Sequence, residues 1–93
     1  MADPIFRGAR VIRGAHLLTQ HNPSWGARID GTMLNMADPT RCILGQLYGH
    51  FSTGLSALGL SPQSAMTSGF IPFDGLDGLH LRLLWLKQVA RSG

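Results

Sequence analysis

The sequence has no glutamate, a single lysine and a single cysteine, and these shortages exclude several kinds of protein. One cysteine cannot form an intramolecular disulfide, nor the zinc sites that take four cysteines. It also favours a reducing compartment, so we expect a cytoplasmic protein. No apolar run approaches the length of a membrane span, and the first ten residues lack the apolar core of a signal peptide. We therefore expect no membrane partner.

The formal net charge is only +3, and arginine carries almost all of the positive charge. A charge of this size permits binding to nucleic acid or to an acidic protein but does not require it. The 93 residues suffice for one modest hydrophobic core, so we expect a single helical domain over residues 1–93.

Four of the five prolines follow a residue that can cap a helix. The residue before proline is held extended, as an N-cap must be, so each pair predicts a helix start. The pairs are Asp3-Pro4, Asn22-Pro23, Asp38-Pro39 and Ser61-Pro62. We predict an all-α fold, a compact bundle of about five short helices. The expected helices cover residues 4–20, 22–30, 39–58, 62–67 and 78–90, with a minor extended segment left open near 32–36.

Residues 39–58 are expected to form the central helix around which the others pack. Seven apolar side chains fall within one arc of roughly 140° on this helix: Ile43, Leu44, Leu47, Tyr48, Phe51, Leu55 and Leu58. Asp38 would be the N-cap and Gly59 the C-terminal stop. The alternative is a break near Gly49, because a glycine inside a helix costs about 1 kcal/mol. A second stripe of small residues predicts a groove for another element: Gly45, Gly49, Ser52 and Ser56.

The first helix carries an arginine face. Its predicted buried side consists of Ile5, Val11, Ile12, Ala15 and Leu18. On the other side, Phe6, Arg10, Arg13 and Leu17 recur at helical spacing, and we hypothesise that they form a protein-binding strip. A solvated basic face is the simpler interpretation. A DNA-binding or regulatory face made of Arg7, Arg10 and Arg13 is the other alternative, although Gln20 is the only amide available there to read bases.

The last helix, with Asp77 as its cap, has two apolar stripes. One holds Leu81, Trp85 and Val89; the other holds Leu79, Leu83, Leu86 and Ala90, and Arg82 lies between them. A chain this short can hardly bury both, so one stripe is a candidate to bind a partner or a second copy of the chain. The preceding loop, residues 69–75, is expected to be anchored in the core by Phe70 and Phe73.

Candidate catalytic and metal-binding residues are few. Cys42 lacks a base, because His50 lies eight residues away, about 12 Å along a helix. No histidine pair has the spacing of metal ligands, and no carboxylate pair suggests acid–base chemistry. We predict a protein without catalytic, metal or cofactor-binding residues, in which Cys42 is buried and unreactive. Gln46 lies beside the apolar arc and is expected to hydrogen-bond the loop backbone of another segment.

Three segments resemble a family of small proteins common in actinobacteria and their phages. They are PSWGARID, RCILGQLYGHF with the motif C-[VI]-L-G-Q-L-[YF]-G, and L-x-x-x-W-x-x-x-V near the end. The chain departs from the pattern at Ser24, where glycine is usual, and at Ser68, where histidine often occurs. The resemblance implies a bacterial or phage origin and a shared helical fold, but no activity. The residues taken as structural are Trp25, Cys42, Leu44, Gly45, Gln46, Gly49 and Trp85.

The expected function is therefore that of a small non-enzymatic protein, phage- or prophage-encoded, that binds a host or phage protein. The small DNA-binding or regulatory protein is the alternative.

Overall fold

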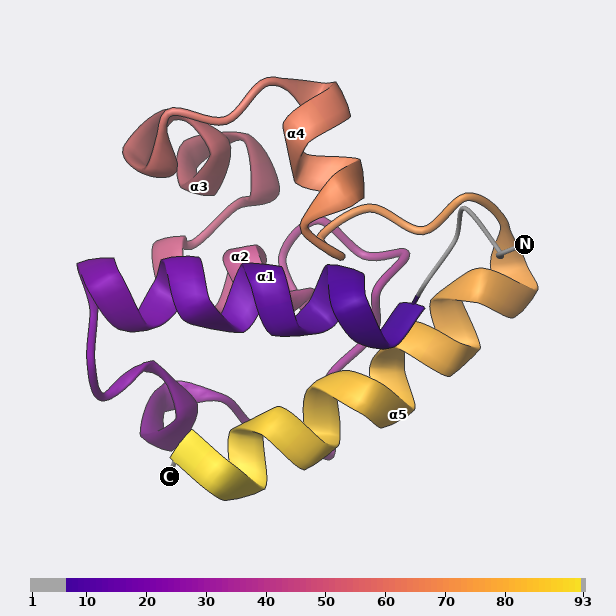
Figure 1. The fold of residues 1–93 in the computed structure, drawn as a ribbon, viewed down its shortest axis with the longest axis horizontal. Coiled ribbons are helices and arrows are strands. Elements are labelled where there is room, and N and C mark those ends of the chain that lie inside the picture. The colour runs from indigo at the N-terminus through magenta and orange to yellow at the C-terminus, as the bar shows by residue number, and fades with distance from the viewer. Residues whose placement is uncertain (1–6, 93) are drawn as a thin grey trace.

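The computed structural model describes residues 7–92, and within this range the chain is all-α, as predicted. Its elements are α1 (Arg7–His21), the 3₁₀ helix η1 (Trp25–Arg28), α2 (Ile43–Tyr48), α3 (Phe51–Leu58), α4 (Pro62–Thr67) and α5 (Gly75–Ser92). In Figure 1, α1 crosses the middle of the molecule, with α5 on one side and α3 and α4 on the other. The described residues include no strand, and the minor extended segment considered near 32–36 consists of turns with irregular backbone at residues 34–35.

The prediction of one central helix over residues 39–58 is wrong, and the alternative break near Gly49 is confirmed. The Asp38 carboxylate accepts the N–H and the hydroxyl of Thr40, both at 2.8 Å, and so forms a turn instead of capping a helix. The helix begins later, where Cys42 is the N-cap and its Sγ accepts the Gly45 N–H at 3.3 Å. Gly49 then ends α2 with a φ of 90°, which only glycine adopts readily.

The other predicted helix starts have mixed outcomes. Ser61 caps α4, as expected, by accepting the Ser64 N–H at 3.1 Å. The predicted helix after Asn22 is reduced to the single turn of η1. The last helix begins at Gly75 rather than Gly78, since Asp74 accepts the Asp77 N–H at 2.8 Å and is the cap in place of Asp77. The start expected at Pro4 lies outside the described residues.

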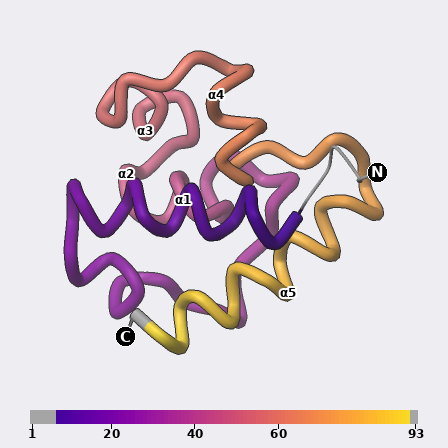
Figure 2. Tube along the Cα trace, viewed as in Figure 1, coloured from indigo at the N-terminus to yellow at the C-terminus, as the bar shows by residue number. Residues whose placement is uncertain are grey.

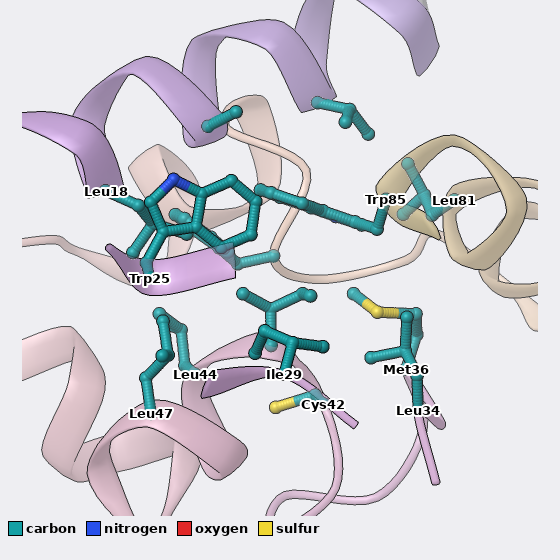
Figure 3. Packing of buried hydrophobic residues seen from close by; sticks show 14 of the residues in the cluster. Leu18, Trp25, Ile29, Leu34, Met36, Cys42, Leu44, Leu47, Leu81 and Trp85 are labelled. Atoms are coloured by element: carbon teal, nitrogen blue, oxygen red, sulfur yellow. The ribbon is translucent and has the colours of Figure 1, made fainter. Parts of the chain in front are cut away.

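The core is built around two tryptophans from opposite ends of the chain (Figure 3). Trp85 of α5 stacks on Phe70 with ring centres 5.3 Å apart and meets the edge of Trp25 at 5.7 Å. Its indole N–H donates to the Gly69 carbonyl at 2.8 Å, so this buried donor is paired. On α1, Gly14 allows this packing, because a Cβ there would lie 2.1 Å from the Ser68 carbonyl oxygen.

A buried ion cluster joins α1 to α5, the two long helices that pack side by side (Figure 2). Arg10 is only 5% exposed, and its guanidinium donates to both carboxylate oxygens of Asp77 at 3.1 and 3.2 Å. It also donates to the carbonyls of Met66 and Ile71, both at 3.0 Å. Arg7 contributes a further bond to Asp77 at 2.8 Å. One carboxylate thus organises both helices and the loop between α4 and α5.

The surroundings of Asp77 fix its charge. Burial alone would raise the pKa of this carboxyl, but hydrogen bonds from Arg10, the Phe73 N–H and Arg7 outweigh it and hold the pKa below its ordinary value.

Phe73 is not the core anchor that was predicted: its side chain is 47% exposed and its ring covers the Arg10 guanidinium, 4.4 Å from the ring centre. Phe70 is buried, as predicted.

We predict that Asp77→Asn lowers the free energy of unfolding by about 3–5 kcal/mol, because it leaves a buried guanidinium without its counter-charge. Urea unfolding followed by circular dichroism measures the change. Asp30→Asn is the matched control, since the Asp30 side chain is exposed and its carboxylate accepts hydrogen bonds from nearby Thr32.

The same cluster predicts the sign of a pH effect. A carboxyl whose folded pKa lies below its unfolded value, about 3.9, stabilises the fold fully above that value. This contribution is lost as the pH falls below about 4 towards the folded pKa. The wild-type protein should therefore lose more stability than Asp77→Asn between pH 5 and pH 2, and parallel losses would contradict the role of the cluster.

Candidate functional site

Of the protein-binding strip predicted on the first helix, the structure describes Arg10, Arg13 and Leu17, and among these three only Arg13 is exposed. Arg10 was expected at the surface and is buried, because Asp77 and two carbonyls bind it. Leu17 is half-buried and packs against the core, Arg13 is exposed, and Phe6 lies outside the described residues. Conversely Ile12, expected in the core, is 59% exposed.

The helical register explains these errors. The buried side of α1 consists of Arg10, Val11, Gly14, Ala15 and Leu18. Ile12 points about 100° beyond Val11 and so leaves this face. The alternative hypothesis was a nucleic-acid-binding face made of Arg7, Arg10 and Arg13. Two of these three arginines, Arg7 and Arg10, bind Asp77 instead of facing solvent freely. Arg13 is the one member of that face that is fully exposed.

The residues predicted to be structural occupy structural positions. Gln46 bridges two segments, as predicted: its Oε1 accepts the Asp30 N–H at 2.6 Å, and its Nε2 donates to the carbonyls of Asp30 at 3.2 Å and Arg41 at 3.0 Å. Gly45 lies against another segment, because a Cβ there would be 2.4 Å from the Pro39 carbonyl oxygen. The wider groove of small residues does not form, as Ser52 and Ser56 are exposed. Leu44, Trp25 and Trp85 are fully buried.

Cys42 has the environment of a core residue with a second role as a helix cap. Its side chain is buried, and burial raises the pKa of the thiol. A raised pKa leaves little thiolate at neutral pH, which opposes nucleophilic catalysis. Residues 7–92 contain no group of three or more histidine, cysteine, aspartate or glutamate side chains placed to hold a metal ion.

The clearest unexplained feature is the outer face of α5. In the stripe of Leu81, Trp85 and Val89, the first two are completely buried and Val89 is partly buried, whereas Leu79 is 63% and Leu83 56% exposed. Leu76, one turn earlier, is 61% exposed and extends the same ridge. Leu76 belonged to neither predicted stripe, although its spacing to Leu79 and Leu83, i, i+3 and i+7, is the signal that could have found it. We call Leu76, Leu79 and Leu83 the leucine ridge.

A groove borders the ridge on each side. One groove, of about 400 Å³, lies between α5 and the loops around Met36 and Pro72; it also contains Leu34, Leu79, Asp74 and Arg82. The other, of about 520 Å³, is lined by Arg7, His80, Leu83, Leu84 and Lys87. Both are mainly apolar, but the charged side chains of the first are of both signs, Asp74 and Arg82, whereas those described in the second are all basic. We call them the apolar groove and the basic groove.

Arg82 builds a wall of the apolar groove. Its guanidinium donates to the carbonyls of Leu34 at 2.9 Å and Gly31 at 3.3 Å, and so ties the loop after η1 to α5. The sequence placed Arg82 between two apolar stripes but gave no sign of this role, because carbonyl acceptors in a distant loop leave no pattern in the sequence. One wall of the groove is therefore loop backbone that is hydrogen-bonded to α5.

Comparisons of the chain with protein-family models, with curated proteins and with solved structures found no match. The relation to the actinobacterial and phage family stays a prediction, and function has to be argued from the surface itself. Within residues 7–92, no helix is both long enough and apolar enough to cross a membrane.

We predict that Cys42 of the native protein reacts with a thiol reagent at neutral pH at least ten times more slowly than in the urea-unfolded chain. Burial and the raised pKa both reduce access to the thiolate. Absorbance of the released chromophore measures both rates. Equal rates would show that the thiol is accessible and contradict its assignment to the core.

We also predict that Gln46→Ala lowers the free energy of unfolding by about 1–2 kcal/mol, and hence the melting temperature by several degrees, because three hydrogen bonds to loop backbone are lost. Gln20→Ala is the control, as Gln20 is exposed on α1. Thermal unfolding of both variants by circular dichroism tests this, and equal melting temperatures would refute the bridging role.

Proposed function

We propose that the protein is a non-enzymatic protein-binding module and that its binding surface is the leucine ridge on α5. The observation that carries the proposal is the exposure of all three leucines, each more than half accessible. Single exposed apolar residues are ordinary, but adjacent ones on one helix face, bordered by two grooves, form the type of patch that marks an interaction site.

The ridge rests on a rigid support. The inner side of α5 is fixed by Leu81 and Trp85 in the core and by the bonds of Asp77 and Arg82 to other segments. A surface that is already ordered loses little conformational entropy on binding, which favours affinity. The i, i+3, i+7 spacing of the leucines is that of helical anchors in known helix-binding modes.

Other proposals have less support. With Arg10 buried and Arg7 bound to Asp77, α1 offers few cations for phosphates, and exposed leucines contribute neither phosphate nor base contacts. The buried thiol of Cys42 does not support catalysis. That the partner is a host or phage protein follows only from the sequence resemblance and is part of the proposal.

The experiment is affinity capture from a lysate of an actinobacterial host with three tagged proteins: the wild type, the double variant Leu79→Asn with Leu83→Asn, and Ile12→Asn. Ile12 is as exposed as the ridge leucines but lies on α1, so it controls for loss of apolar surface. All three should give the same helical circular dichroism spectrum, because none of the changed side chains is in the core.

We predict that the wild type and Ile12→Asn retain the same protein, and that the double variant binds it at least a hundredfold more weakly. Each leucine, once buried, contributes about 1.5 kcal/mol or more to association. A protein retained equally by all three would place the interface elsewhere and refute the role of the ridge.

A further inference from the structure

We infer that the partner of the leucine ridge is an amphipathic helix of another protein with acidic side chains along one flank. This inference rests on the proposed function, because it describes what that surface would bind. It is carried by the difference between the two grooves that border the ridge.

The basic groove has an excess of positive charge. Arg7, His80 and Lys87 line it together with two leucines, and none of its lining residues within 7–92 is a carboxylate. The carboxylate that pairs with Arg7 is Asp77, and it is shared between two guanidinium groups, Arg7 at 2.8 Å and Arg10 at 3.1 Å. One negative charge cannot neutralise both, so this pair contributes a net positive charge behind the groove. Glutamate or aspartate side chains of a partner would complement it.

The apolar groove has the opposite character. Its walls include Leu34, Met36 and Pro72. Its charged lining residues are of both signs: Arg82, which is already bonded to two carbonyls, and the exposed Asp74, whose carboxylate would repel an acidic flank. An apolar side chain of the partner would fit there over Leu79. The contrast also fixes how the partner helix is rotated: its acidic flank faces α1 and its apolar stripe faces the ridge and the loop around Met36.

A second copy of the chain is a poorer match for this surface. The only carboxylate within α5 is Asp77, which is buried, whereas His80, Lys87 and Arg91 are exposed. Packing two α5 helices face to face in parallel would place basic side chains next to basic side chains, while the exposed Asp74 before α5 lines the apolar groove and not the basic one. Like charges brought together in this way disfavour the pairing.

The test uses three synthetic helical peptides as probes. Each has leucines at i, i+3 and i+7 in an alanine-rich background, and they differ only in flanking residues, which are Glu, Gln or Lys. Fluorescence anisotropy at low and at 300 mM salt gives their affinities. We expect the Glu peptide to bind at least ten times more tightly than the Gln peptide at low salt, the Lys peptide to bind most weakly, and salt to reduce the difference.

Two variants locate the charge effect. Lys87→Glu and Arg13→Glu each lower the formal net charge from +3 to +1, but only Lys87 lines the basic groove. Lys87→Glu should abolish the preference for the Glu peptide, and Arg13→Glu should keep most of it. Equal loss in both would show that net charge, rather than the groove, selects the peptide, and would overturn the inference.

The remaining outcomes separate this inference from the proposed function. Equal binding of the Glu and Gln peptides, lost in the Leu79→Asn, Leu83→Asn double variant, would keep the ridge as an interface and refute the acidic partner. Binding that the double variant leaves unchanged would count against both. If the wild type sediments as a dimer and the double variant as a monomer, the occupant of the ridge is a second copy of the chain. If the wild type, but not the double variant, cosediments with phosphatidylglycerol vesicles, the occupant is a lipid surface. Either result would overturn the inference.

Discussion

The rest of the structure depends on the buried pair formed by Arg10 and Asp77. A buried charge is tolerated only when it is paired and hydrogen-bonded, and here both requirements are met by groups from four segments. The pair holds α1 against α5 and fixes the loop from Met66 to Phe73. That loop presents Gly69 and Phe70 to Trp85, so the position of the central tryptophan follows from the ion pair as well as from apolar packing.

Side chains that bind backbone carbonyls organise the long irregular segment between η1 and α2. Arg28 donates to the Leu47 carbonyl at 3.1 Å, Gln46 bonds Asp30 and Arg41, and Arg82 bonds Gly31 and Leu34. Irregular backbone has no helical or sheet partners for its polar groups, so it needs such acceptors and donors from outside. Polar side chains of η1, α2 and α5 supply them, and one wall of the apolar groove is a result.

Features governed by neighbouring residues could be predicted from the sequence, such as the Ser61 cap, the stop at Gly59 and the bonding of Gln46 to loop backbone. The prediction that Asp38 is a helix N-cap was wrong because Thr40, two residues later, hydrogen-bonds to the Asp38 carboxylate. The predicted surface position of Arg10 was wrong because its burial depends on Asp77, which is 67 positions away in the chain. A local sequence pattern does not show which distant residue a side chain contacts. For the candidate site, the sequence indicated that α5 has more apolar surface than a small core can cover. The grooves that give the ridge its chemistry come from loops and from α1, so only the structure could reveal them.

The pairing of α1 with α5 also determines the order in which folding can occur. The first described helix finds its main partner in the last one, across a separation of about 70 residues. During synthesis, Arg10, Val11 and Leu18 have no completed surface to bury against until α5 has been made. Contacts so distant in the chain must wait for a large loop to close, which slows folding relative to helical proteins with local contacts. The molecule is thus expected to fold as one late, cooperative event rather than helix by helix from its beginning.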